Sequence, residues 1–136
     1  MTEIAAQPFT MKDVNLTVGT DDYKRHVSRV RFVPTVNRST WKALAPAATY
    51  GAQGLAEWSC ELALAQDWEN EDSLARYLLE NDGLEVSATF RPVAGGPGFT
   101  STITLTPPTI GGDVDTTATA EVTLACTTPV PVAALP

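Results

Sequence analysis

The residues best suited to chemistry in this sequence are four carboxylates within a short stretch, Asp67, Glu69, Glu71 and Asp72. Grouped carboxylates can coordinate a metal ion or share the roles of general acid and general base. Either role needs further ligands or a nucleophile, and the neighbouring sequence supplies none. We interpret the cluster as the start of a helix, because carboxylates in the first turn interact favourably with the helix dipole.

The predicted helix lies in the stretch NEDSLARYLLENDG, residues 70–83. Asn70 is its expected N-cap, and Asp72 can pair with Arg76 one turn later. Gly83 suits the left-handed C′ position that ends many helices. The expected buried stripe consists of Leu74, Leu78 and either Tyr77 or Leu79.

The single histidine provides the other candidate for catalysis, because Asp22 and Ser28 lie near His26 in the sequence. Alternation along a strand sends close neighbours to fixed faces, and no nucleophile elbow or oxyanion motif accompanies them. Cys60 and Cys126 have no CxxC spacing, so a zinc site is not expected. We predict buried free thiols, with a disulfide as the alternative. The sequence therefore indicates no enzyme, no catalytic residues, no metal and no cofactor.

Length and composition limit the architecture to one domain. The 136 residues are 43% hydrophobic, which is sufficient for a single core. No apolar segment approaches the roughly 20 residues that span a bilayer, and the N-terminus lacks the basic flank and apolar run of a signal peptide. We expect a single soluble domain over residues 1–136 with no membrane span.

The charge of the chain is divided along its length. Its net charge of −7 argues against direct wrapping of nucleic acid. Residues 1–42 hold seven basic and four acidic residues, a balance of +3, whereas residues 43–136 hold two basic and twelve acidic residues, a balance of −10. Such a chain can attract a copy of itself head to tail. The alternative is that both charge sets pair within one subunit.

Period-two alternation of apolar residues predicts about six strands. They cover residues 12–18, 26–36, 55–66, 84–92, 99–106 and 118–128. The expected inward side chains are Val30, Phe32, Val36, Trp58, Cys60, Leu62, Leu64, Leu84, Val86, Phe90, Ile103, Leu105, Val122 and Leu124. This pattern indicates a mainly β fold, a β-sandwich or small barrel of about six or more strands with one flanking α-helix.

Three segments do not fit a self-contained monomer. An extended loop over residues 37–54 follows the second predicted strand, has no periodic pattern and carries Trp41, Leu44 and Tyr50. Long loops of this kind are often functional, and Trp and Tyr are enriched at interface centres. The alternative is a loop that folds back over its own sandwich. The other two segments are an N-terminal arm, residues 1–11, and an apolar, proline-rich C-terminal arm, residues 128–136.

The order of motifs resembles that of the major tail tube proteins of long-tailed, siphovirus-like bacteriophages. DDYKRHVSRVRFVPT is followed by a Trp-bearing loop, then by WSCELALAQDW, SLARYLLENDG, VSATFRPVAGG and IGGD before a final strand. The similarity spans roughly residues 12–128. Its specificity rests on order and spacing, because none of these motifs is diagnostic alone.

The resemblance implies a structural virion protein that forms sixfold rings, which stack into the hollow tail tube through which genome DNA passes into the host. Its implied partners are further copies of itself and the tape measure, tail tip and tail terminator proteins, while DNA passes without specific binding. The implied location is the virion tail, after assembly in the host cytoplasm. Joined sheet edges would satisfy backbone groups that a monomer leaves open.

The resemblance also implies roles for particular residues. Trp41, Leu44 and Tyr50 are the candidates for the contact between rings. A second set, Arg25, Arg29 and Arg31, is expected on the outward side of its strand and is predicted to pair with Glu57 and Glu61 or with an adjacent subunit. The candidates for a polar wall of the lumen, which would repel phosphate, are Glu57, Ser59, Glu61, Thr102, Thr104, Thr119, Glu121 and Thr123.

Two other functions remain open from the sequence. A monomeric β-sandwich module that binds a saccharide or protein ligand would also use an aromatic loop. The tube protein of a contractile injection system would share both fold and ring.

Overall fold

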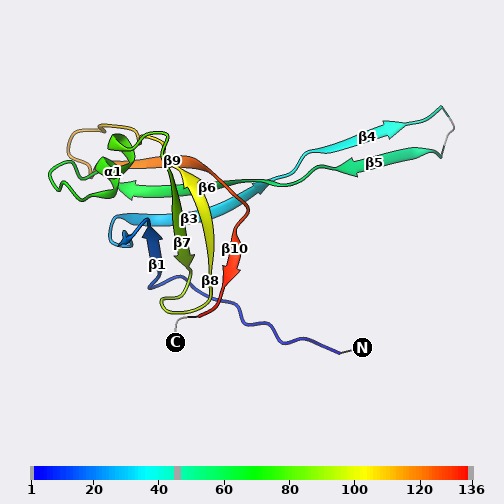
Figure 1. The fold of residues 1–136 in the computed structure, drawn as a ribbon, viewed down its shortest axis with the longest axis horizontal. Coiled ribbons are helices and arrows are strands. Elements are labelled where there is room, and N and C mark those ends of the chain that lie inside the picture. Colours follow the sequence, from blue (N-terminus) through cyan, green and yellow to red (C-terminus); the bar gives the residue numbers. More distant parts are fainter. Residues whose placement is uncertain (1, 45–46, 135–136) are drawn as a thin grey trace.

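The computed structural model describes residues 2–44 and 47–134. These residues form ten strands and one helix (Figure 1). The elements are β1 (Asn15–Val18), β2 (Asp21–Asp22), β3 (Val27–Thr35), β4 (Arg38–Lys42), β5 (Thr49–Gln53), β6 (Glu57–Ala65), α1 (Leu74–Glu80), β7 (Glu85–Arg91), β8 (Gly98–Thr104), β9 (Thr119–Cys126) and β10 (Val130–Val132).

The main sheet is antiparallel and has the strand order β2-β1-β7-β8-β9-β6-β3, with β10 paired to β8. Strands β3, β6 and β9 cross the direction of β1, β7 and β8, so the sheet folds into two layers (Figure 1). The layers are joined where β8 meets β9 through the pair Ile103 and Cys126, after which the chain continues as β10 along β8. This confirms a mainly β sandwich with one helix, with strands crossing steeply between layers.

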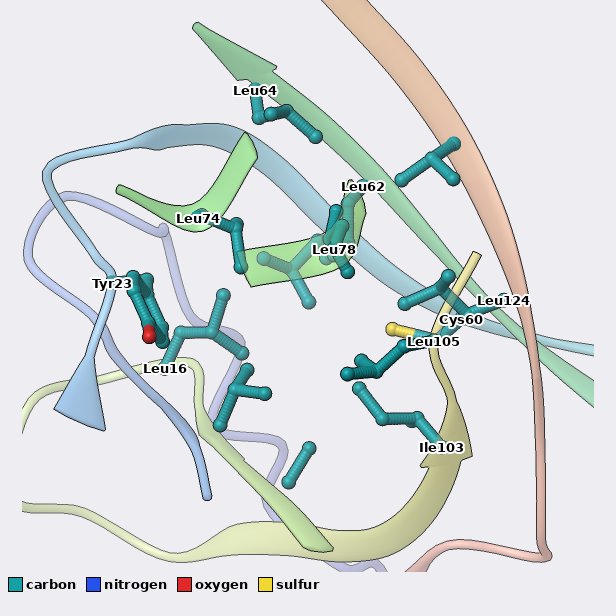
Figure 2. Close-up of a cluster of buried hydrophobic side chains, with 14 of the residues drawn as sticks. Leu16, Tyr23, Cys60, Leu62, Leu64, Leu74, Leu78, Ile103, Leu105 and Leu124 are labelled. Carbon is teal, nitrogen blue, oxygen red and sulfur yellow. The ribbon is translucent and has the colours of Figure 1, made fainter. Parts of the chain in front are cut away.

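The core lies between these layers and is closed at one end by α1 (Figure 2). Alternation correctly predicted most of its inward side chains, including Leu62, Ile103 and Leu124, which are almost fully buried. Two predictions were wrong. Val36 and Leu84 are exposed because β3 ends at Thr35 and β7 begins at Glu85, so both residues lie beyond the paired strands.

The helix begins later than predicted. Ser73, not Asn70, is the N-cap, and its hydroxyl accepts a hydrogen bond from the Arg76 N–H while donating one to the Asp67 carbonyl. Arg76 pairs with Glu80 at 3.2 Å rather than with Asp72. The residues that bury the helix are Leu74, Ala75 and Leu78, and Tyr77 rather than Leu79 packs against the core.

The end of the helix also differs from the prediction. Asn81 is the C-cap, and its side-chain amide donates to the Tyr77 carbonyl. Gly83 therefore lies one residue beyond C′. It nevertheless has a positive φ of 83°, the left-handed conformation for which the glycine was predicted. Its N–H donates to the Leu105 carbonyl, which ties the helix exit to the strand layer below.

Residues 37–54 do not form the irregular loop that the sequence analysis predicts. They contain β4 and β5, which pair antiparallel as a separate two-stranded sheet. The hairpin projects away from the sandwich at the end opposite α1 (Figure 1). All ten strand residues are exposed, so the alternative of a loop folded over its own sandwich is also wrong.

The described part of the N-terminal arm has no helix or strand, whereas part of the C-terminal arm pairs with the main sheet. Residues 2–11 contain no helix or strand and are exposed, although Phe9 lines an apolar pocket of about 280 Å³ with Phe32, Phe90 and other residues. The C-terminal arm is not free along its whole length. Its residues 130–132 form β10, and the Arg91 guanidinium donates to the Ala133 carbonyl at 2.8 Å.

Candidate functional site

The acidic cluster is a turn that leads into the helix. Asp67 Oδ1 accepts hydrogen bonds from the N–H groups of Glu69 and Asn70, and Asn70 Oδ1 accepts one from Asp72 N–H. Because the helix begins at Leu74, Glu71 and Asp72 precede its first turn instead of lying in it. Within residues 2–44 and 47–134, no three His, Cys, Asp or Glu side chains are grouped closely enough to hold a metal ion.

His26, Asp22 and Ser28 are each engaged with other groups. The His26 ring packs edge-on against Tyr23 with centroids 5.9 Å apart. Asp22 Oδ1 accepts from the Lys24 N–H, and the Ser28 hydroxyl donates to the Ala63 carbonyl. None of these contacts links two members of the sequence-predicted group.

Both cysteines are free thiols, as predicted, but only Cys60 is buried and Cys126 is half-buried. Burial raises the pKa of Cys60 to about 12, with smaller contributions from Cys126 and Glu61. Burial also raises the pKa of Cys126, while a hydrogen bond with Ser101 acts in the opposite direction. At neutral pH both side chains are therefore protonated and act as small hydrophobes.

Most of the predicted lumen candidates share the outward side of β3, β6 and β9, which we call the polar sheet face. The register places Glu61 between Arg31 and Thr123, and Ala63 between Arg29 and Glu121. The residues of this face with polar side chains are Arg29, Arg31, Thr35, Glu57, Ser59, Glu61, Thr119, Glu121 and Thr123.

Two ion pairs cross the polar sheet face. Arg31 pairs with Glu61, as predicted, and Arg29 pairs with Glu121 at 3.1 Å, a partner that the sequence analysis missed. Glu57 lies opposite Thr35 rather than opposite an arginine. The face therefore carries two arginines against three glutamates, so it is closer to neutral than the predicted polar wall, whose charged members were all glutamates.

Arg25 does not belong to this row. It lies in the turn before β3. The register of β3 shifts between Val27 and Arg29, so counting alternate residues back from Arg29 does not place Arg25 on the same side of the sheet. Arg25 instead lines a pocket of about 320 Å³ between the starts of β1 and β3.

Thr102 and Thr104 lie on the outer side of the other layer, opposite Ser87 and Glu85 of β7. They line a groove of about 190 Å³ with Ala125 at the junction of β8 and β9. The lumen candidates thus form two neighbouring patches that meet at this groove, not one continuous row.

The β4–β5 hairpin brings together two of the three predicted ring-contact residues. Trp41 and Tyr50 are directly opposite in the register, and their rings stack with centroids 5.5 Å apart. Trp41 remains 64% exposed and Tyr50 60% exposed. Leu44, beyond the end of β4, is fully exposed.

The hairpin lacks the support that such a structure normally needs. An isolated two-stranded hairpin is marginally stable in water, and three strands or packing against another element are usually required. Here all ten strand residues are exposed and the two strands form their own sheet. The ribbon therefore exposes a stacked aromatic pair that its own subunit does not cover.

Sequence reasoning missed the basic residues of this ribbon. Arg38 and Lys42 lie on the side of β4 opposite Trp41, facing Gln53 and Thr49 in the register. The available signal was that Arg38, Thr40 and Lys42 alternate with Ser39 and Trp41 in RSTWK. This alternation is not one of apolar and polar residues, because neither side of the strand is buried.

Comparisons with known proteins give no assignment: no protein-family model matches the chain, and no curated protein matches it in sequence. In the part of the chain that the structure describes, no helix has the length and apolar character needed to cross a membrane.

Proposed function

We propose that this chain is a structural virion protein that polymerises as stacked hexameric rings into a hollow phage tail tube, through which genome DNA reaches the host. The observation that carries the proposal is the exposed β4–β5 hairpin with its Trp41–Tyr50 stack. A ribbon that its own subunit leaves unsupported is expected to gain its stability from neighbouring copies. Trp41, Leu44 and Tyr50 are the proposed contacts between rings.

The free edge of the main sheet supports assembly into a ring. β3 is the terminal strand of the sheet and runs for nine residues, Val27–Thr35. A long unpaired edge is a template for pairing with another chain, and proteins normally cover or interrupt it. β3 includes Pro34, a residue found at sheet edges because it cannot donate a ladder hydrogen bond. Pairing along the rest of this edge would join one subunit to the next.

The polar sheet face suits the wall of a channel for DNA. Its arginines are held in ion pairs with glutamates of the same subunit, which leaves Thr, Ser and carboxylate groups for the lumen. Such a wall offers few unpaired cations to phosphate, so DNA could slide without specific binding. The tape measure, tail tip and tail terminator proteins are the further partners of this proposal, and the virion tail, built in the host cytoplasm, is its location.

A second candidate is a monomeric β-sandwich module that binds a saccharide or protein ligand without catalysis. The same exposed aromatic stack favours it, since stacked rings offer a flat apolar platform. The tube protein of a contractile system is a variant of the first proposal that shares its ring.

Negative-stain electron microscopy with light scattering, over a range of concentrations, tests the proposal. We expect rings or hollow tubes with a regular repeat, in the presence of a tail-tip complex if assembly needs an initiator. A chain that stays monomeric when concentrated and with that complex present would overturn the proposal and favour the ligand-binding module.

A further inference from the structure

The two sides of the β4–β5 hairpin differ in chemistry. Residues paired across an antiparallel ladder share a side, and alternate residues of a strand fall on opposite sides. The register therefore defines an aromatic face, consisting of Ser39, Trp41, Tyr50 and Ala52. It also defines a basic face, consisting of Arg38, Thr40, Lys42, Thr49, Gly51 and Gln53.

On the basic face, the Arg38 side chain lies close to Gly51 of the paired strand. A Cβ atom built on Gly51 would lie 3.1 Å from Arg38 Nη2, so the guanidinium extends across the glycine. Lys42 lies two positions beyond Thr40 on the same face. The two cations thus present charge from one side of the ribbon, while the stacked rings occupy the other.

These two cations have no acidic partner on their own hairpin. The sequence contains no Asp or Glu between Asp22 and Glu57. Among the residues that the structure describes, the four ion pairs involve Lys24, Arg29, Arg31 and Arg76, and neither hairpin cation. The complementary charge is abundant elsewhere in the chain, since residues 43–136 hold two basic and twelve acidic residues.

A two-stranded ribbon is one layer thick, so a partner that covers one side leaves the other in water. An apolar surface suits the aromatic face, whereas an acidic surface suits the basic face. We propose that each hairpin lies between two other copies of this chain, with its aromatic face against one copy and its basic face against acidic residues of the second. This inference rests on the proposed self-assembly and adds that each hairpin bridges two neighbours at once.

Photo-crosslinking distinguishes one neighbour from two. Ser39 and Thr40 are small, exposed and adjacent, and they lie on opposite faces of the ribbon. A photoreactive phenylalanine analogue is placed at position 39, at position 40 or at both, and each modified chain is assembled with a large excess of unmodified chain. After irradiation, the chains are separated under denaturing conditions.

We expect each singly modified chain to give a two-chain product, and the doubly modified chain to give a three-chain product in addition. A doubly modified chain that gives only two-chain products would overturn the inference while leaving the proposed assembly intact. An unmodified chain that forms neither rings nor tubes, with no cross-link from any variant, would overturn the proposed function itself.

The charge requirement of the basic face has its own matched control. Arg38→Gln with Lys42→Gln should raise the concentration needed for tube growth about tenfold or more at low salt, and the difference from the original chain should shrink as salt screens the contact. Arg38→Lys with Lys42→Arg keeps both charges and should assemble normally. Equal assembly of the neutral and the charge-keeping variants at low salt would contradict an acidic partner.

Discussion

The body of the sandwich and the β4–β5 hairpin are both antiparallel sheet, but they bury their side chains differently. In the body, the long strands have one side in the core, as Leu62 and Leu124 illustrate, and outward charges such as Arg29 and Glu121 pair with one another. In the hairpin both sides of each strand are exposed, and even the large side chains of Trp41 and Tyr50 are mostly in contact with water. The difference teaches that the core of the body carries the stability of the monomer, whereas the hairpin, which buries none of its strand residues, adds little to it.

The strongest expected effect is on the body. Leu78→Ala removes a fully buried side chain between the helix and the strand layers, and should lower the free energy of unfolding by about 2–5 kcal/mol. Chemical denaturation followed by circular dichroism measures this loss. Leu79→Ala, one residue along the same helix but exposed, is the control and should change little.

The next largest effect is expected in the hairpin, where a substitution should weaken assembly and leave the folding of the monomer unchanged. Trp41→Ala should leave the unfolding of the monomer unchanged, and should weaken assembly by about 2 kcal/mol, or about 30-fold in the concentration needed for tube growth. Light scattering with electron microscopy measures assembly, and thermal melts measure folding. Lost folding without an assembly defect would show that Trp41 belongs with the core and would remove the contrast between the two regions.

A smaller effect is expected at the start of the helix. Ser73→Ala deprives the Arg76 N–H and the Asp67 carbonyl of their buried hydroxyl partner, and should cost about 1–2 kcal/mol of stability. Asn70→Ala, at the cap predicted from sequence, should cost less because Asn70 is exposed and only accepts from a turn N–H. The reverse order in denaturation experiments would contradict the assignment of Ser73 as the cap.

The smallest of the expected losses of monomer stability is at the polar sheet face, since Trp41→Ala is expected to cause none. Arg29→Glu replaces a half-exposed ion pair with two like charges, and should change monomer stability by about 1 kcal/mol or less. We expect a clear assembly defect beside this small change in folding, because the reversed charge would also meet the neighbouring subunit. Intact assembly would count against a role for Arg29 between subunits.

Much of the body could be predicted from sequence because one side of each of its longer strands is buried. Alternation in residues 58–64 and 120–124 follows directly from this one-sided burial. The hairpin could not be found in the same way, since a ribbon with two wet sides needs no apolar alternation. β2 and β10 were missed because they are two and three residues long.

The remaining errors came from local geometry that residue types do not specify. Asn70, Asp72 and Ser73 are all good N-caps, and the selection depends on which hydroxyl or carboxylate meets the helix N–H groups in three dimensions. Ser73 is selected because its hydroxyl also binds the Asp67 carbonyl. Arg25 was wrongly placed beside Arg29 and Arg31 for a similar reason. A register shift in β3 breaks the alternation of sides along that strand.

Pro34 has a consequence for the unassembled chain. A newly folded chain carries the long edge of β3, which could capture an unrelated extended segment or another incomplete chain. A proline within that edge shortens the run of donors available to such a stray strand. In the proposed ring, the neighbouring subunit would pair with the rest of this edge, N-terminal to Pro34. Pro34 should therefore slow non-specific aggregation through the β3 edge, whether or not the chain assembles.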